Sequence, residues 1–278
     1  YAEALAARRA SLTGDERFHL ARALEECQFV ASMTEDLAAF SAKKRREFLG
    51  TLPLDNPQGN ALRIAAYDAA DNTQRCLGFQ TSKISPKEIQ DLYAAAAQQG
   101  DARAQARMLV AELTNKASAT KPDGTPNANR VSGEDVSRII GLLETKDPEA
   151  VMTVGQFLAQ SALAAQLRVG PNGEVPEASA FLGAFSLVAC DMGPDCMQLT
   201  REPLNACAYA GYCNAQTYEE LYQNFLASPY AYSQAMRYRD LIHTAIDTHN
   251  WTLIGLVPGT PIKKRLGAVT LFQQSYFN

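Results

Sequence analysis

The sequence predicts an all-α fold: antiparallel helix pairs stacked as a repeat-like superhelix, stapled by disulfides and followed by an extended C-terminal tail. Alanine is abundant, and long stretches contain neither proline nor glycine, which favours helix. Short turns rich in glycine or proline separate these stretches, as is typical of paired helices. The even number of six cysteines indicates the disulfides.

The N-terminal helical repeat region is expected over residues 1–116. Its first helix has apolar residues at helical spacing, and Thr34 is suited to cap the second, which ends before Pro53. Ser85-Pro86 supplies the cap and the first helical position of a fourth helix. The five helices expected here cover residues 15–33, 35–48, 60–78, 86–100 and 102–116.

Residues 117–133 are polar and rich in proline, glycine and asparagine, so they predict a long exposed loop. A loop of this length is either a domain boundary or a functional insertion. The C-terminal helical region, residues 134–250, follows it behind a capping-box pattern at Ser132 and Asp135. Its helices are expected over residues 133–143, 148–167, 178–192, 202–209, 217–227 and 230–248. Residues 251–278 carry prolines, glycines and then β-prone residues, which predicts the extended tail.

A segment that includes Tyr93, Ala96-Ala97, Gly100 and Ala104 resembles the Sel-one-like repeat, a relative of the tetratricopeptide repeat. In that family an aromatic residue, an alanine pair and a turn glycine close the first helix, and an alanine four residues later opens the second. Small residues let the paired helices approach closely, and glycine tolerates the left-handed turn. The family's Leu-Gly in the second helix is Met108-Leu109 here.

Weaker similarity to the same pattern follows further along the chain. Ala150 to Gly155 keeps the alanine and the hydrophobic-glycine step, but Lys146 stands at the turn. Ala189-Cys190 and Ala206-Cys207 look like the same helix end with cysteine in place of the second alanine. The resemblance implies a superhelix whose concave groove binds a protein or peptide.

The six cysteines are expected to form three disulfides, two between near neighbours in the C-terminal region and one between the two upstream cysteines. Closing a loop of about 50 residues stabilises the fold by roughly 4 kcal/mol, and closing one of about seven by roughly 2 kcal/mol. Zinc binding, a redox role and cross-pairing among the four C-terminal cysteines are open alternatives, although paired zinc ligands usually have closer spacing. The expected pairs are Cys27–Cys76, Cys190–Cys196 and Cys207–Cys213.

No catalytic, cofactor-binding or metal-binding residue is assigned. His243, Asp247 and His249 could form half of a metal site, and the alternative is an exposed helix end where histidine complements the dipole. Ser41 and Lys44 have the spacing of some acyl-transfer enzymes, but a charged helix face is the simpler interpretation. Trp251, the sole tryptophan, is expected to anchor the tail on the core, and the alternative is that it forms part of a binding surface.

These features predict an exported, non-catalytic module that binds a protein or peptide in the periplasm or at the cell surface. The disulfides indicate an oxidising compartment. A removed signal peptide would explain a start at Tyr1, and a trimmed chain would explain it equally well. A net charge of −4 gives no basic field for nucleic acid, and no apolar run is long enough to span a membrane. Two alternatives remain: a structural subunit that associates with itself through the tail, or an enzyme without a local motif.

Overall fold

A computed structural model describes residues 11–34, 36–71, 73–76, 79, 84–118, 131–193 and 197–262. The N-terminal helices are α2 (Gly14–Met33), α3 (Leu37–Gly50), α4 (Pro57–Ala70), α5 (Thr73–Cys76), α6 (Pro86–Gln98) and α7 (Ala102–Ser118). The C-terminal helices are α8 (Gly133–Glu144), α9 (Pro148–Leu158), α10 (Ser161–Ala164), α11 (Ala178–Asp191), α12 (Met197–Asn205), α13 (Tyr218–Leu221) and α14 (Pro229–Thr248). Two π-helical turns, η3 (Ala206–Ala210) and η4 (Tyr222–Leu226), and a 3₁₀ turn, η5 (Trp251–Ile254), complete the described elements.

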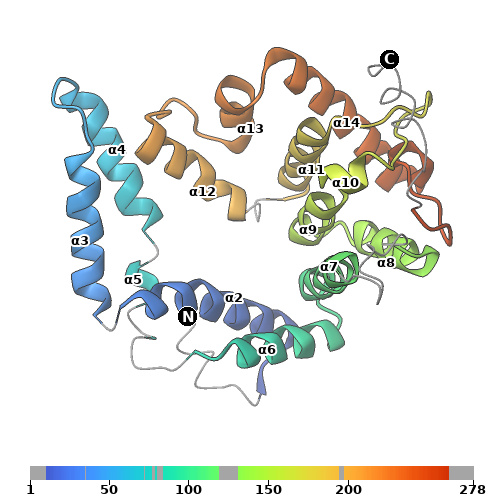
Figure 1. Ribbon diagram of the computed structural model, residues 1–278, viewed down its shortest axis with the longest axis horizontal. Helices are drawn as coiled ribbons and strands as arrows, with labels where there is room; N and C mark the ends of the chain where they lie inside the picture. The colour runs from blue at the N-terminus through green and yellow to red at the C-terminus, as the bar shows by residue number, and fades with distance from the viewer. Residues whose placement is uncertain are drawn as a thin grey trace, which may run out of the picture.

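The helices are arranged in a ring (Figure 1). Around one side, α2 packs on α6, α6 on α7, α7 on α9, α9 on α11 and α11 on α14. Helices α3 and α4 extend from the N-terminal end of this stack, and α4 meets α12 and η3 on the opposite side. The predicted all-α fold of stacked helix pairs is therefore confirmed, and the contact of α4 with α12 and η3 closes the ring.

The turn between α6 and α7 has the close packing that small residues permit. Ala96 and Ala104 are completely buried, and Gly100 adopts a φ of 88°. A side chain with a Cβ is strained in that conformation, so glycine suits the turn. The Sel-one-like identity of this helix pair stays a prediction. At the weaker match, Lys146 itself adopts the left-handed conformation, with a φ of 54°.

The largest core lies in the C-terminal region, where α9, α11 and α14 face one another. Phe181 and Phe185 of α11 are completely buried and meet edge to face, with ring centroids 5.0 Å apart. Both rings belong to the largest of the hydrophobic clusters among the described residues. A second core joins α2, α5 and α6, and a third, smaller cluster around Phe48 and Tyr67 joins α3 and α4 to η3.

Two of the three expected disulfides lie within the described residues. Cys27 in α2 is bonded to Cys76 in α5, and Cys207 in η3 is bonded to Cys213 in the following loop. The third expected pair includes Cys196, which lies outside the described residues. The first disulfide lies in the N-terminal core, and the second fixes η3 where the ring closes.

Several helix boundaries differ from the sequence prediction. The helix expected over residues 60–78 breaks at Asp71, which ends α4 before α5 begins. The cap of α3 is Asp36 and not Thr34, because Oδ1 of Asp36 accepts a hydrogen bond from the amide of Ala39 at 2.9 Å. The predicted helices over 202–209 and 217–227 both end in π-helical turns, η3 and η4.

The first residues of the predicted C-terminal tail form a helical turn and are not extended. Trp251 begins the 3₁₀ turn η5 and is 4% exposed, which confirms that it packs on the core. The only β-pairing in the described residues consists of two isolated bridges, and one of them joins Ile262 to Val131. Residues 263–278, with the proposed tail-mediated association, lie outside the described residues. No helix in the described part is both long and apolar enough to cross a membrane.

Candidate binding site

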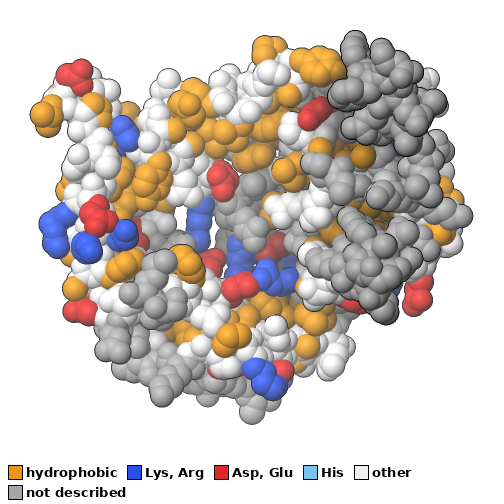
Figure 2. Space-filling model, viewed as in Figure 1, with side chains coloured by type: hydrophobic (Ala, Val, Ile, Leu, Met, Phe, Trp, Pro, Cys, Tyr) orange, Lys and Arg blue, Asp and Glu red, His pale blue; other side chains and the backbone are white. Residues whose placement is uncertain are grey.

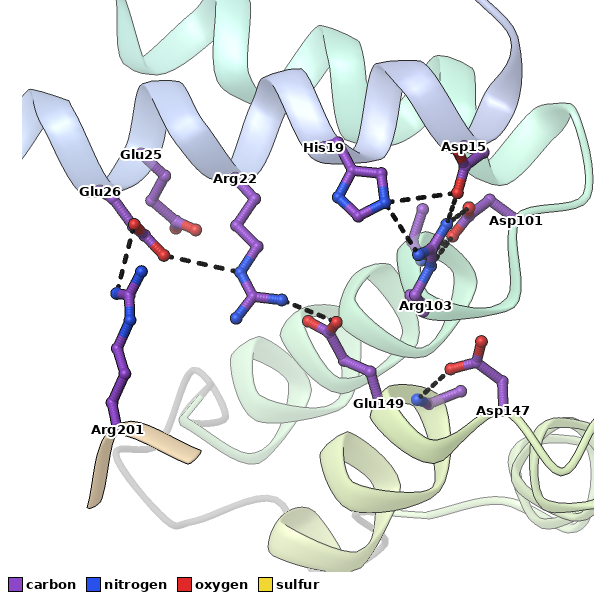
Figure 3. A network of polar contacts seen from close by, with 12 residues as sticks. Asp15, His19, Arg22, Glu25, Glu26, Asp101, Arg103, Asp147, Glu149 and Arg201 are labelled. Atoms are coloured by element: carbon purple, nitrogen blue, oxygen red, sulfur yellow. Dashed lines mark hydrogen bonds and ion pairs between the residues drawn. The ribbon is translucent and has the colours of Figure 1, made fainter. Parts of the chain in front are cut away.

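Charged side chains gather at the centre of the ring, where the molecule is hollowed (Figure 2). They come from α2, α7, α9 and α12, so this face brings together distant parts of the sequence. Figure 3 shows the principal contacts.

Arg22 of α2 forms the middle of this network. Its Nη1 donates to Oε2 of Glu149 on α9 at 2.8 Å, and its Nε lies 3.6 Å from Oε1 of Glu26. Glu26 also lies 3.4 Å from Nη1 of Arg201 on α12 (Figure 3). One chain of charges therefore crosses the hollow from α9 through α2 to α12.

Arg103 of α7 forms a second group beside it. Its Nη2 donates to Asp15 and Asp101, each at 2.6 Å, while its guanidinium lies 4.3 Å from the ring centroid of Phe18. Nε2 of His19 lies 3.4 Å from both Asp15 and Arg103. Arg103 thus links Asp15, at the start of α2, to Asp101, which lies just before α7.

Burial and pairing shift the pKa values of these acids in opposite directions. Burial raises the pKa of Glu149, and Arg22 offsets that shift only in part. The hydrogen bond from Arg103 holds the pKa of Asp15 below its ordinary value. Each of these acids is ion-paired with an arginine, so the network braces the helices. It does not offer a pair of unoccupied carboxylates for acid and base catalysis.

The three residues of the possible metal half-site are held by different partners. Nε2 of His243 lies 2.8 Å from Asp191, Asp247 accepts from Lys146 at 2.7 Å, and Nδ1 of His249 lies 3.0 Å from Glu144. No group of three potential metal ligands occurs among the described residues. The arrangement agrees with the alternative interpretation, an exposed helix end.

The Ser41 and Lys44 spacing does not produce a catalytic pair. Oγ of Ser41 donates to Asp71 at 2.9 Å, and Nζ of Lys44 donates to Glu47 at 3.0 Å. The serine therefore fixes the end of α4 against α3, while the lysine lies on the exposed face of its own helix. This agrees with the charged-face interpretation.

An apolar cleft lies where the ring closes, between α4 and η3. Its volume is about 420 Å³. Leu62, which is 57% exposed, lies on the α4 side, and the disulfide of Cys207 and Cys213 lies on the other. The remaining lining residues are Ala65, Ala66, Pro203, Leu204, Ala215 and Gln216. We call this the α4–η3 cleft.

The wall of the α4–η3 cleft is held by a contact between α4 and the π-helical turn. Nε of Arg63 donates to the carbonyl of Ala208 at 2.8 Å, and its Nη2 donates to that of Tyr209 at 3.1 Å. These carbonyls are at the end of a helix, where no further turn supplies donors. The arginine therefore fixes η3 against α4 and keeps the cleft in shape.

Three aromatic rings support the same wall from behind. Phe48 and Tyr67 stack with centroids 4.2 Å apart, and Tyr209 meets both edge to face at 5.7 and 6.1 Å. Burial, with a smaller effect of Tyr209, raises the pKa of Tyr67 to about 12. The Tyr67 hydroxyl is therefore neutral at physiological pH.

Sequence reasoning did not single out Leu62 or Arg63. Both lie in an ordinary helical stretch, and their role depends on η3, which follows about 145 residues later. The sequence does mark the other side of the cleft. Residues 203–236, which include its lining residues from Pro203 to Gln216, contain six of the eleven tyrosines and no lysine or arginine.

Comparison with known proteins identifies no relative: no family model matches the chain, nor does any curated protein or solved structure. The proposals below therefore depend on the geometry of this chain.

Proposed function

We propose that this chain is an exported, non-catalytic helical-repeat module that binds a protein or peptide, in the periplasm or at the cell surface. The α4–η3 cleft is the observation that carries the proposal. It is apolar, open to solvent and lined from two distant segments of the chain. Apolar clefts of this kind take the anchor side chain of a partner, and surrounding contacts then exclude water.

The shape of the cleft supports a preformed site. Arg63 fixes η3 against α4, and the disulfide of Cys207 and Cys213 constrains the opposite side. A partner that enters such a site loses less free energy to ordering than one that must organise a mobile surface. The disulfides also fit an oxidising compartment, which supports an exported protein.

The size of the cleft indicates the anchor. A volume of about 420 Å³ accommodates one large aliphatic or aromatic side chain with part of its backbone. Leu62 at the rim gives that anchor an apolar contact. We therefore expect partner segments that share one large apolar residue and vary around it.

Selection from a random peptide library displayed on phage tests this function. Peptides enriched on the oxidised protein are synthesised and titrated by fluorescence anisotropy. We expect a shared apolar anchor and a loss of at least about tenfold in affinity for Leu62→Glu, which places a charge at the rim. Leu54→Glu, at a fully exposed position in the loop between α3 and α4, should bind as the original chain does. A selection without enrichment, or equal binding by both variants, contradicts the proposal.

A further inference from the structure

The α4–η3 cleft has a disulfide in its wall. Cys207, in η3, and Cys213, in the loop that follows it, are bonded to each other, and both line the cleft. Sγ of Cys207 also lies 3.7 Å from the backbone carbonyl oxygen of Leu62 on α4. The bond is therefore part of the proposed binding surface, with α4 on one side of it and the loop on the other.

This disulfide is more accessible than the one in the N-terminal core. Cys27 and Cys76 are 3% and 1% exposed and lie among apolar side chains of α2 and α6. Cys207 is 8% exposed, but its partner Cys213 is only partly buried and lines an open cleft. Exposed disulfides are the ones that are labile or regulatory. The same reductant should therefore open the cleft disulfide first.

The disulfide tethers the loop that forms one side of the cleft. At one end of this loop the amide of Tyr212 donates to a carbonyl of η3, and at the other the amide of Gln216 donates to Glu220. Between them, the backbone amides of Asn214 and Ala215 donate no hydrogen bond to any part of the described chain. Ala215 itself lines the cleft. Opening the disulfide should therefore let this wall move away from α4.

The fold can accommodate the reduced pair. Arg63 holds η3 on α4 through two carbonyls, and neither contact involves the disulfide. Each sulfur also lies near a carbonyl oxygen: Cys207 is 3.7 Å from that of Leu62, and Cys213 is 3.6 Å from that of Cys207. A thiol is a weak hydrogen-bond donor, so both reduced side chains would have an acceptor in reach. Reduction should therefore loosen one wall without unfolding the ring.

We propose that the Cys207–Cys213 disulfide is a redox switch for the α4–η3 cleft. The oxidised form binds the partner, and the reduced form releases it. The inference rests on the proposed function and adds its regulation. An exported protein meets oxidising conditions, so the form that binds is the resting state. The reductant is a dithiol, supplied by the paired thiols of a second protein.

The switch operates by thiol–disulfide exchange. One thiolate of the reductant attacks Sγ of Cys213, the more exposed partner, and forms a mixed disulfide, while Cys207 leaves as a thiolate and takes up a proton. The second thiolate of the reductant then attacks its neighbour in the mixed disulfide and releases Cys213, which is protonated in turn. Two electrons and two protons pass from the dithiol to the two cysteines, and the dithiol becomes a disulfide.

Graded reduction with dithiothreitol tests the order in which the disulfides open. Free thiols are trapped with N-ethylmaleimide, and mass mapping assigns the label to individual cysteines. We expect label on Cys207 and Cys213 at a reductant concentration at least about tenfold lower than on Cys27 and Cys76. Earlier labelling of Cys27 and Cys76, or labelling of both pairs together, overturns the inference.

Affinity for a library-selected peptide tests the switch itself. Once Cys207 and Cys213 are reduced, fluorescence anisotropy should show an affinity at least about tenfold lower, which returns on reoxidation. The variant Cys190→Ala with Cys196→Ala should respond in the same way. The variant Cys207→Ala with Cys213→Ala should bind weakly with or without reductant. Unchanged affinity after reduction of Cys207 and Cys213 overturns the inference.

Hydrogen–deuterium exchange separates this inference from the proposed function. Reduction should speed exchange over residues 211–216 and leave α11 unchanged. If the loop responds in this way but no peptide is selected, the proposed function fails and the redox-sensitive wall stands. If a peptide binds but neither the loop nor the affinity responds to reduction, the disulfide is only a structural staple and the inference is overturned. Faster exchange throughout α11 also overturns it, because the reduced protein would then be unfolded.

Discussion

Arg22 and Glu149, separated by 127 positions in the sequence, form an ion pair in which Nη1 lies 2.8 Å from Oε2. Each side chain is only 14% exposed, and the pair joins α2 to α9 across the hollow of the ring (Figure 3). Desolvation makes such a pair a modest source of net stability. Replacing only one of the two residues strongly destabilises the fold, because the charge of the other residue stays buried without a partner.

Arg22→Met should therefore destabilise the protein by about 3 kcal/mol, measured by urea unfolding at pH 7. Arg45→Met is the matched control, because its partner Asp68 and Arg45 itself are both more than 40% exposed. The loss of stability in Arg45→Met should be much smaller than that in Arg22→Met, because solvent screens an exposed pair. The double variant Arg22→Met with Glu149→Leu should recover most of the stability. Equal losses for the two single variants would show that the central pair is solvated.

Asp191 predicts a pH dependence of stability. Burial opposes its ionisation, but hydrogen bonds from Arg239 and His243 outweigh burial and hold the pKa of Asp191 below its ordinary value. An acid with a lowered folded-state pKa contributes stability above its unfolded pKa, which is about 3.9, and loses that contribution as the pH falls through the folded-state value.

The stability of Asp191→Asn should accordingly be reduced at pH 7 and should fall less steeply below about pH 4 than that of the original chain. Urea midpoints between neutral and acidic pH measure the two slopes. Asp55→Asn, in the exposed loop before α4, should leave the profile unchanged. Parallel acid limbs for Asp191→Asn and the original chain would contradict the assignment.

Two glycines mark the closest approaches in the core. A Cβ on Gly155 would lie 2.2 Å from Cγ of Phe185, and a Cβ on Gly183 would lie 2.3 Å from the Tyr222 ring. Gly155→Ala and Gly183→Ala should each cost about 1–3 kcal/mol in thermal or urea unfolding. Gly141→Ala should instead stabilise by about 0.5–1 kcal/mol, because nothing lies within 4 Å of its Cβ. A stabilising Gly155→Ala would mean that α9 and α11 are further apart.

The two described disulfides should differ in their contributions to stability. Cys27 and Cys76 are 49 positions apart, whereas Cys207 and Cys213 are six apart. Replacing the first pair by alanine should cost roughly 4 kcal/mol, and replacing the second roughly 2 kcal/mol, because the longer loop is restrained more in the unfolded chain. The second replacement should nevertheless weaken peptide binding more, since it borders the α4–η3 cleft. A larger loss of stability on replacing Cys207 and Cys213, or a larger loss of peptide affinity on replacing Cys27 and Cys76, would contradict these assignments.

Local chemistry made most of the fold predictable. The capping box of Ser132 and Asp135, the glycine turn at Gly100 and the apolar run of α11 are all encoded within a few neighbouring residues, and the structure has each of them. The disulfide of Cys207 and Cys213 was also predictable, because its two cysteines are only six positions apart.

Closure of the ring could not be predicted in this way. It depends on Arg63 reaching the carbonyls of η3 and on Phe48 and Tyr67 meeting Tyr209, contacts that span more than 140 positions. The π-helical turns were missed because helix propensity does not distinguish them from an α-helix. The α4–η3 cleft is a product of both features and therefore has no local motif.

Hydrogen–deuterium exchange of the oxidised protein, with and without a library-selected peptide, tests the central claim most directly. Binding in the α4–η3 cleft predicts slower exchange for amides of α4 and of residues 203–216, with little change in α8 or α14. The same peptide should give no protection in Leu62→Glu. Protection confined to other elements, or protection that persists in Leu62→Glu, would contradict the account.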